Sequence, residues 1–113
     1  MKKHLLIIRE VDRSIFDAVE SGRKIVETRA ATPKYRKIKK GDVLEFKCGA
    51  DVILKKAKKI IVFNHISDLL ERYRACEINP DLSTEEEIEK MYYSFPDYKE
   101  KIDKFGIIAI ELE

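Results

Sequence analysis

The chain has 113 residues, of which 44% are hydrophobic and 39% charged, and its formal net charge is +2. A typical domain has about 100–150 residues, so we expect one domain spanning 1–113, with a real core and no room for a second domain. Gln is absent, Asn occurs only twice, and Lys and Glu are abundant, which is typical of proteins from thermophiles.

The N-terminus and the cysteines disfavour several classes of protein. The first apolar run, Leu5–Ile8, has only four residues, too few for a signal-peptide core or a membrane span, so we expect a cytoplasmic protein that binds no membrane. Cys48 and Cys76 are 28 positions apart and form no C-x-x-C pair. We therefore expect two reduced, buried thiols, no disulfide, no metal site and no cofactor.

The N-terminal segment predicts a strand followed by a helix. His4–Arg9 is a short apolar run bounded by charge, which is typical of a buried strand. Asp12 is a candidate N-cap, and apolar residues then recur at helical spacing as far as Ser21. Gly22 follows directly, where a left-handed residue often ends a helix, so we expect a positive φ there.

The next segment predicts a strand and then a loop. Lys24–Ala30 has the pattern of a strand, with Glu27 and Arg29 on one face and Lys24 on the other. Lys24 and Glu27 can therefore meet only if Lys24 still lies in the preceding turn or a bulge intervenes. Ala31–Lys40 is expected to be a loop.

A hairpin is expected in the middle of the chain. Val43–Cys48 alternates apolar and charged residues as a half-buried strand does, and a turn at Gly49–Asp51 leads into a long strand over Val52–Phe63. The long strand should be bent or bulged around Ala57, because the lysines beside it fall on both faces. Lysines of this kind also protect edge strands against pairing with other molecules.

The C-terminal segment predicts helices and a closing strand. Ser67 is a candidate cap for a helix over Asp68–Arg74, and Ser83 or Thr84 caps a second helix with an acidic first turn. The second helix ends before Pro96 and carries an apolar stripe of Ile88, Met91, Tyr92 and Phe95. A short helix and a strand follow at Tyr98–Phe105 and Ile107–Leu112.

These elements add up to an α+β domain. We expect a mixed sheet of about five strands with helices near both ends of the chain. A sheet this small is expected to curl into a partial β-barrel.

Charge is segregated along the chain. Residues 22–59 contain thirteen Lys or Arg against four Asp or Glu, whereas residues 77–103 contain three against nine. The basic segment can form a face that attracts anions while the whole molecule stays nearly neutral. If the fold interleaves the two segments instead, their charges cancel.

The basic segment contains an ordered motif, G-x-K-x-x-E-x-R at residues 22–29, followed by G-D at residues 41–42. The motif resembles that of the ASCH domain family, a member of the PUA-like superfamily. The resemblance continues in VFNHISDLL, MYYSF and KFGIIAIELE, and so covers essentially the whole chain. It implies a small PUA-like mixed β-barrel with flanking helices, a cleft beside the motif, and RNA or nucleotide binding, with no established activity for most members.

The charged motif residues have a plain and a functional interpretation. Glu27 and Arg29 share a strand face and can simply pair with each other. In the functional interpretation Arg29 or Lys24 receives a phosphate or carbonyl oxygen, and Glu27 accepts a hydrogen bond from a base amine or a sugar hydroxyl.

Tyr35 is the one aromatic residue of the basic loop. Its ring can stack on a base while Lys34 and Arg36 meet the phosphates, or it can fold back and pack on the barrel. The sequence thus predicts an RNA- or nucleotide-binding site composed of Lys24, Glu27, Arg29, Lys34, Tyr35 and Arg36.

Two alternatives remain open. The first is a small hydrolase, a ribonuclease or an enzyme similar to the ASCH amidohydrolases that act on N4-acetylcytidine, in which burial makes Lys24 a base and Glu27 its acid or proton relay. In those amidohydrolases the motif lysine works with a Thr at the position of Glu27 and with a later Glu, for which Glu77 is the candidate here. The second alternative is a protein-interaction module that uses the acidic helix 83–95.

Overall fold

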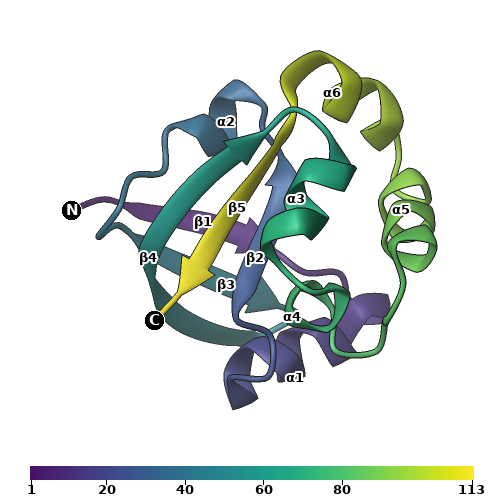
Figure 1. The fold of residues 1–113 in the computed structure, drawn as a ribbon. Coiled ribbons are helices and arrows are strands. Elements are labelled where there is room, and N and C mark those ends of the chain that lie inside the picture. The colour runs from purple at the N-terminus through teal and green to yellow at the C-terminus, as the bar shows by residue number, and fades with distance from the viewer.

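Five strands form one curled mixed sheet, with helices on its outer side and at its ends, in a computed structural model that describes residues 1–113 (Figure 1). The strands are β1 (Lys3–Ile7), β2 (Val26–Ala30), β3 (Val43–Cys48), β4 (Asp51–Phe63) and β5 (Ile107–Leu112). The helical segments are the 3-10 turn η1 (Glu10–Asp12), α1 (Arg13–Ser21), α2 (Pro33–Arg36), α3 (Ile66–Arg72), α4 (Ala75–Ile78), α5 (Glu85–Tyr93) and α6 (Tyr98–Phe105). The prediction of an α+β, barrel-like domain with flanking helices is confirmed.

The sheet has the order β1-β3-β4-β5-β2, so β1 and β2 are its two edges. β1 and β3 are parallel, and the other pairs are antiparallel. The long strand β4 pairs with β3 through residues 51–56 and with β5 through residues 57–63, with a register shift between Ala57 and Lys59. The predicted bulge is therefore confirmed, and it lies where β4 changes partner.

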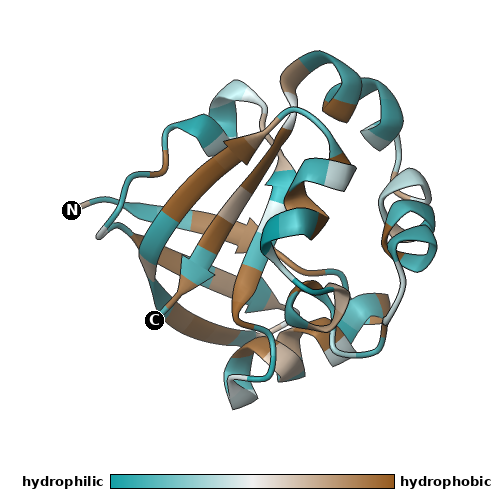
Figure 2. Cartoon of the chain, viewed as in Figure 1, coloured by the Kyte–Doolittle hydropathy of each residue, from teal (hydrophilic) through white to brown (hydrophobic).

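Two hydrophobic cores lie on the two faces of the sheet. The inner core gathers residues from β1, α1, β3 and β5, among them Leu6, Phe16, Leu44, Phe46, Ile108 and Ile110. The outer core lies between the sheet and the C-terminal helices and includes Val26, Leu69, Ile88, Tyr92, Ile107 and Ala109. β5 alternates between the two cores, which explains why it is a continuous apolar run, and Figure 2 shows apolar strands beneath largely hydrophilic helices.

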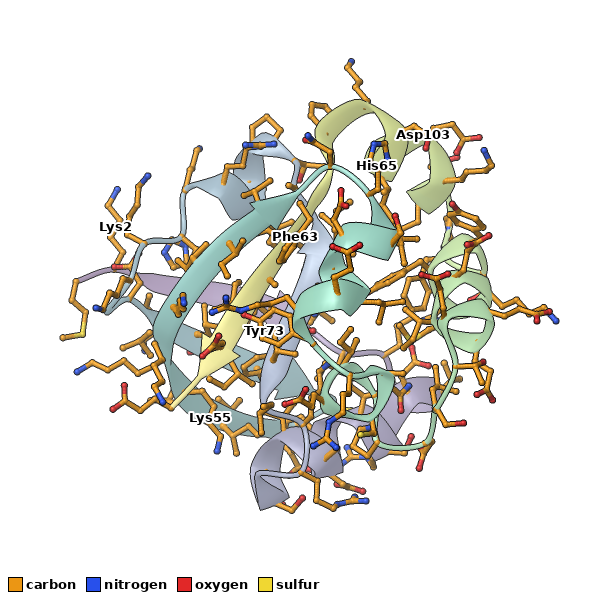
Figure 3. All side chains as sticks on the ribbon, viewed as in Figure 1. Lys2, Lys55, Phe63, His65, Tyr73 and Asp103 are labelled. Carbon is orange, nitrogen blue, oxygen red and sulfur yellow. The ribbon has the colours of Figure 1, made fainter.

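A tyrosine fixes the end of α3 to the sheet. The rings of Phe63 and Tyr73 meet edge to face with centroids 6.4 Å apart (Figure 3). The Tyr73 hydroxyl donates to Glu111 at 2.7 Å, and burial together with this carboxylate raises the pKa of Tyr73 to about 12. The contact joins the first C-terminal helix to the closing strand.

Several predicted boundaries are wrong. The first two strands are β1 (Lys3–Ile7) and β2 (Val26–Ala30), so neither Arg9 nor Lys24 lies in a strand. The predicted loop contains the single turn α2, because Pro33 suits the first helical position, where no N–H is needed.

The region after β4 also differs from the prediction. α3 begins at Ile66 and has no side-chain cap, so Ser67 lies within it, and the short α4 was not predicted. Thr84 is the cap of α5, with Glu87 completing a capping box. Cys48 is buried as expected, whereas Cys76 is exposed.

Glycines at positive φ end two of the helices. Gly22 follows α1 with φ +81°, which confirms its predicted role, and Gly106 follows α6 with φ +82°. A Cβ at Gly22 would meet nothing within 4 Å, but a Cβ at Gly106 would lie 2.5 Å from the carbonyl oxygen of Phe63. Only glycine allows the chain to enter β5 so close to the end of β4.

Two kinds of feature are absent from the structure. No helix combines the length and the apolar character needed to cross a membrane. No group of three or more His, Cys, Asp or Glu side chains is arranged to hold a metal ion.

Candidate functional site

A cleft of about 480 Å³ opens where the two edge strands β1 and β2 leave the sheet unclosed. Its walls come from the segment that joins β1 to α1, from β2, and from the chain between α4 and α6. Its volume lies within the ~300–1,000 Å³ typical of small-molecule sites. Lys24, Glu27 and Arg29 all line it, so the structure brings these three motif residues together. We call it the motif cleft.

The late start of β2 lets Lys24 and Glu27 meet. After Gly22 the chain turns, and the Lys24 N–H donates to the Ala18 carbonyl at 3.0 Å rather than to a strand. Because β2 begins only at Val26, strand alternation does not apply to Lys24. Its Nζ lies 3.6 Å from Glu27 Oε1. The two residues were expected to meet only through a turn or a bulge, and the turn after Gly22 brings them together.

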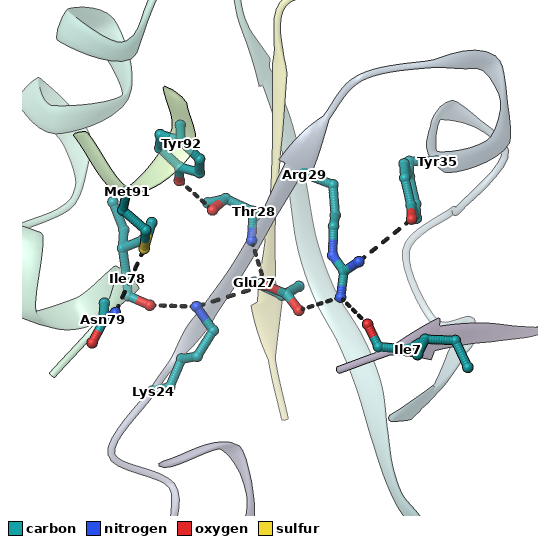
Figure 4. Close-up of polar contacts among 10 residues, drawn as sticks. All are labelled: Ile7, Lys24, Glu27, Thr28, Arg29, Tyr35, Ile78, Asn79, Met91 and Tyr92. Carbon is teal, nitrogen blue, oxygen red and sulfur yellow. Dashed lines mark hydrogen bonds and ion pairs between the residues drawn. The ribbon is translucent and has the colours of Figure 1, made fainter. Parts of the chain in front are cut away.

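The Lys24 side chain is only 4% exposed. Its ammonium group donates to the carbonyl oxygen of Ile78, the last residue of α4 (Figure 4). Burial lowers the pKa of Lys24, the Glu27 carboxylate raises it and the Arg29 charge lowers it, with a net pKa below the ordinary value. Lys24 is thus a buried amine that loses its proton more readily than a surface lysine.

Glu27 is the buried carboxylate between the two cations. Its Oε1 accepts the N–H of Thr28 at 2.9 Å, and its Oε2 lies 3.3 Å from Arg29 Nη2. Burial raises the pKa of Glu27, but the charges of Arg29 and Lys24 and the Thr28 N–H outweigh it, so the pKa lies below the ordinary value. Glu27 therefore remains an ionised acceptor.

Arg29 bridges the open edge of the sheet. Its guanidinium donates to Glu27, to the carbonyl oxygen of Ile7 at the end of β1 at 3.3 Å, and to the hydroxyl of Tyr35 at 3.4 Å (Figure 4). Burial lowers its pKa and Glu27 raises it, with a net pKa above the ordinary value, so Arg29 stays charged. With 17% of its side chain exposed, it is the most accessible of the three motif residues.

The far wall of the cleft is apolar and aromatic, and its side chains are Met91, Tyr92, Phe95 and Tyr98. Phe95 and Tyr98 meet edge to face with centroids 5.2 Å apart. At the rim, the guanidinium of Arg9 lies 5.7 Å from the centroid of the Phe95 ring and pairs with Asp12 at 2.8 Å. The sequence pattern did not indicate Phe95 as a site residue. A stripe of apolar residues at helical spacing indicates that these residues are buried, but not which part of the protein they contact.

The threonine next to Glu27, Thr28, and the later glutamate candidate, Glu77, are both bonded to other residues. The Thr28 hydroxyl shares a buried hydrogen bond with the Tyr92 hydroxyl, and burial raises the pKa of Tyr92 above its ordinary value. Glu77 accepts the Arg74 N–H at 2.8 Å at the start of α4, and it does not line the cleft. Thr28 lines the motif cleft together with Lys24, whereas Glu77 does not, so the cleft does not contain all three residues of the amidohydrolase pattern.

The three loop residues predicted for the site lie elsewhere. The Tyr35 ring packs against the inner core, and the Arg29 guanidinium lies 5.6 Å from the centroid of this ring. Lys34 is exposed and lies 5.3 Å from the same ring. Arg36 donates to the carbonyl oxygens of Ala31 and Phe105. None of the three lines the motif cleft.

The downstream G-D pair has a structural role. The Asp42 carboxylate accepts hydrogen bonds from the backbone N–H groups of Lys2 and Lys39 and lies 2.8 Å from His4 Nε2. The bond to His4 and the two N–H groups hold the pKa of Asp42 well below its usual range. Asp42 thus ties the start of β1 to the start of β3.

Two solved structures share this fold over nearly their whole length. The crystal structure of hypothetical protein PH0355 superposes with a TM-score of 0.85 at 30% sequence identity, covering 100% of this chain and 98% of that one. The solution NMR structure of protein PF0455 from Pyrococcus furiosus superposes with a TM-score of 0.77 at 29% identity, covering 98% and 96% of the two chains. No protein-family model and no curated protein matches the sequence.

Proposed function

The chain belongs to the family of hypothetical protein PH0355, and we propose that its motif cleft binds a nucleotide, either free or as one unit of an RNA strand. The observation that carries the proposal is the convergence of Lys24, Glu27 and Arg29 on one cleft that also has an aromatic wall. The resemblance of the motif to the ASCH family supports the same class of ligand.

The chemistry of the cleft suits a base better than a simple anion. A base has a flat apolar face and an edge that carries both donors and acceptors, so it needs an aromatic surface and groups of both kinds. Phe95 supplies an aromatic ring, Glu27 an acceptor and Arg29 donors. Stacking of one base on an aromatic side chain contributes about 1–3 kcal/mol.

A phosphate on the same ligand would meet a cation at the rim. Arg9 has 58% of its side chain exposed and lines the same cleft as Arg29. Charge-assisted hydrogen bonds from guanidinium groups are well suited to phosphate oxygens. Binding of a nucleotide should therefore weaken with salt, whereas binding of a nucleoside should respond less.

Titration calorimetry with the common nucleosides and their 5′-monophosphates tests the proposal. Phe95→Ala should weaken binding by about fivefold or more, which corresponds to the lower end of the stacking contribution. Tyr93→Ala is the matched control, because Tyr93, the last residue of α5, lies two positions before Phe95, is 40% exposed and does not line the cleft. Absence of binding by the wild type, or equal losses in the two variants, would contradict the proposal.

One observation favours hydrolysis as a second candidate: burial lowers the pKa of Lys24 beside an ionised carboxylate. Lowering the pKa of a lysine increases the fraction of neutral amine that can act as a base, and Glu27 lies close enough to exchange a proton with it or with a bound water. The assay is turnover of N4-acetylcytidine and of simple RNA substrates by the wild type, Lys24→Ala and Glu27→Gln. Turnover by the wild type that is lost in both variants, at a temperature where both remain folded, would favour the enzyme over the binding module.

A further inference from the structure

A second hollow, of about 970 Å³, lies between the segment after α2 and the middle of β4, and it shares no residue with the motif cleft. Six basic residues line it, against two acidic ones, Glu111 and Glu113. We call it the basic groove, and its basic residues are Arg36, Lys39, Lys40, Lys56, Lys58 and Lys59. The motif does not include any of them.

The change of partner along β4 creates the groove. The last backbone hydrogen bonds between β4 and the segment before β3 run from the Gly41 N–H to the Ala57 carbonyl and from the Ala57 N–H to the Asp42 carbonyl, both at 2.8 Å. Beyond Ala57, β4 pairs with β5 on one side and with no strand on the other. The chain between α2 and β3 therefore faces an open edge of β4, and Figure 1 shows α2 beside the end of that strand.

The bulge keeps two adjacent lysines out of the protein interior. Ala57 and Ile60 both pack in the inner core, although regular alternation would place residues three apart on opposite faces. The register shift between Ala57 and Lys59 moves the alternation by one residue. As a result Lys58 and Lys59 are both exposed at the groove.

The basic residues of the groove have no carboxylate partners. Elsewhere on the surface lysines do form ion pairs, such as Lys90 with Glu86 at 3.2 Å and Lys99 with Asp103 at 3.5 Å, whereas no ion pair involves any of the six groove residues. Glu111 accepts the Tyr73 hydroxyl instead.

Arg36 is a fixed cation at the edge of the groove. It donates to the carbonyl oxygens of Ala31 at 2.7 Å and Phe105 at 2.6 Å, which hold the guanidinium without neutralising it. Protection of an open strand edge explains lysines on β4 itself. It does not explain Arg36, Lys39 and Lys40, which face that edge from another segment.

We propose that the basic groove binds the phosphodiester backbone of a nucleic-acid strand. Closely spaced cations without partners repel one another, and a ligand with regularly spaced negative charges relieves this repulsion and releases counterions. The groove has no aromatic side chain on which a base could stack, since its apolar residues are Ile38, Ala57, Ile60, Val62 and Ile108. Contacts there are therefore with phosphates and do not depend on sequence.

The test is fluorescence anisotropy with labelled oligouridylate RNA and oligothymidylate DNA of about 12 nucleotides, over a series of salt concentrations. Lys39→Ala/Lys58→Ala/Lys59→Ala removes three groove charges, and Lys90→Ala/Lys99→Ala/Lys101→Ala is a control with the same change in net charge on α5 and α6. The groove variant should bind about tenfold more weakly or worse, and its slope of log affinity against log salt should be shallower by about 2. The control should match the wild type.

Several outcomes overturn the proposal: no binding of either strand by the wild type, an unchanged groove variant, equal losses in both variants, or binding of phosphatidylglycerol vesicles without binding of either strand. Binding of the RNA alone, or of both the RNA and the DNA, supports the proposal and shows which kind of nucleic acid the basic groove accepts. The basic groove is independent of the motif cleft. If Phe95→Ala has no effect on nucleotide binding while the groove variant changes the salt slope, only the proposed function fails.

Discussion

The buried ammonium group of Lys24 donates a hydrogen bond to the carbonyl oxygen of Ile78, 54 residues further along the chain. This bond joins the motif to the end of α4, and the Glu27 carboxylate lies within 3.6 Å of the same ammonium. The cleft is thus assembled from the start of β2 and from a helical segment that has no motif of its own. The stability of the fold and the chemistry of the cleft depend on the same groups.

Replacing Lys24 by methionine should change how stability depends on pH. The pKa of Lys24 in the folded protein lies below its value of about 10.4 in an unfolded chain. Between those two values the unfolded state binds more protons, so the stability of the wild type rises with pH there, whereas a methionine side chain does not titrate. Urea denaturation of both proteins from neutral pH to about pH 10 should show the free energy of unfolding of the wild type rising relative to that of Lys24→Met. A constant or falling difference would mean that the amine is not desolvated.

Glu27→Gln should destabilise the protein strongly at neutral pH. Removing this carboxylate leaves Arg29 and Lys24 buried without their shared anion, a change that typically costs about 3–5 kcal/mol. Glu86→Gln is the control, because its exposed pair with Lys90 contributes less than about 1 kcal/mol. Chemical denaturation of the wild type and of the two variants measures their free energies of unfolding.

The destabilisation by Glu27→Gln should also depend on pH. The pKa of Glu27 is lowered in the folded state, so its contribution is complete above about pH 4.3 and is lost as the pH falls through the folded value. The wild type and Glu27→Gln should therefore approach each other in stability in acid. A stability gap that widens on acidification would contradict this account.

Two glycine variants should differ although both glycines have a positive φ. Gly22→Ala should cost about 1 kcal/mol, because only the backbone conformation is strained and no atom lies near the new Cβ. Gly106→Ala should cost clearly more, because its Cβ would collide with the carbonyl oxygen of Phe63 and force β4 and β5 apart. Equal shifts of melting temperature in the two variants would show that the close approach to Phe63 does not constrain the fold.

Arg9→Gln should separate phosphate recognition from base recognition. The exposed guanidinium of Arg9 at the rim is expected to contribute about 1.5–3 kcal/mol through a hydrogen bond to a phosphate. The variant should bind 5′-monophosphates more weakly and nucleosides as well as the wild type does. Arg23→Gln, which removes an exposed arginine outside the cleft, should bind both as before. Equal loss of nucleoside and nucleotide binding would show that Arg9 does not contact a phosphate.

Most of the fold was predicted from the alternation of apolar and polar residues and from the Gly and Pro residues that end helices and strands. Val43–Cys48 and Ile107–Leu112 are strands at the expected positions, because their patterns depend only on which residues are buried. The start of β2 was wrong by two residues, since the hydrogen bond from Lys24 to the Ala18 carbonyl extends the turn after α1. That error matters, because it decides whether Lys24 reaches Glu27.

The candidate site was predicted only where its residues are close in sequence. Lys24, Glu27 and Arg29 were found through their local motif, but Ile78 and Phe95 reach the cleft through the packing of α4 and α5, for which the sequence carries no local signal. Proximity in sequence was also misleading. Arg36 lies seven positions after Arg29 but in a different hollow, because α2 turns the chain away from the cleft.

Nucleotide binding in the motif cleft can be tested by titrating the isotopically labelled protein with a 5′-nucleotide and recording amide nitrogen–proton correlation NMR spectra. We expect shifts of the backbone amides of Arg29, Asn79 and Phe95, because these residues line the motif cleft from separate elements. The amides of Lys39–Gly41, in the basic groove, should shift less at the same nucleotide concentration. Shifts confined to the basic groove, or no shifts at all, would contradict the claim that this cleft binds a nucleotide.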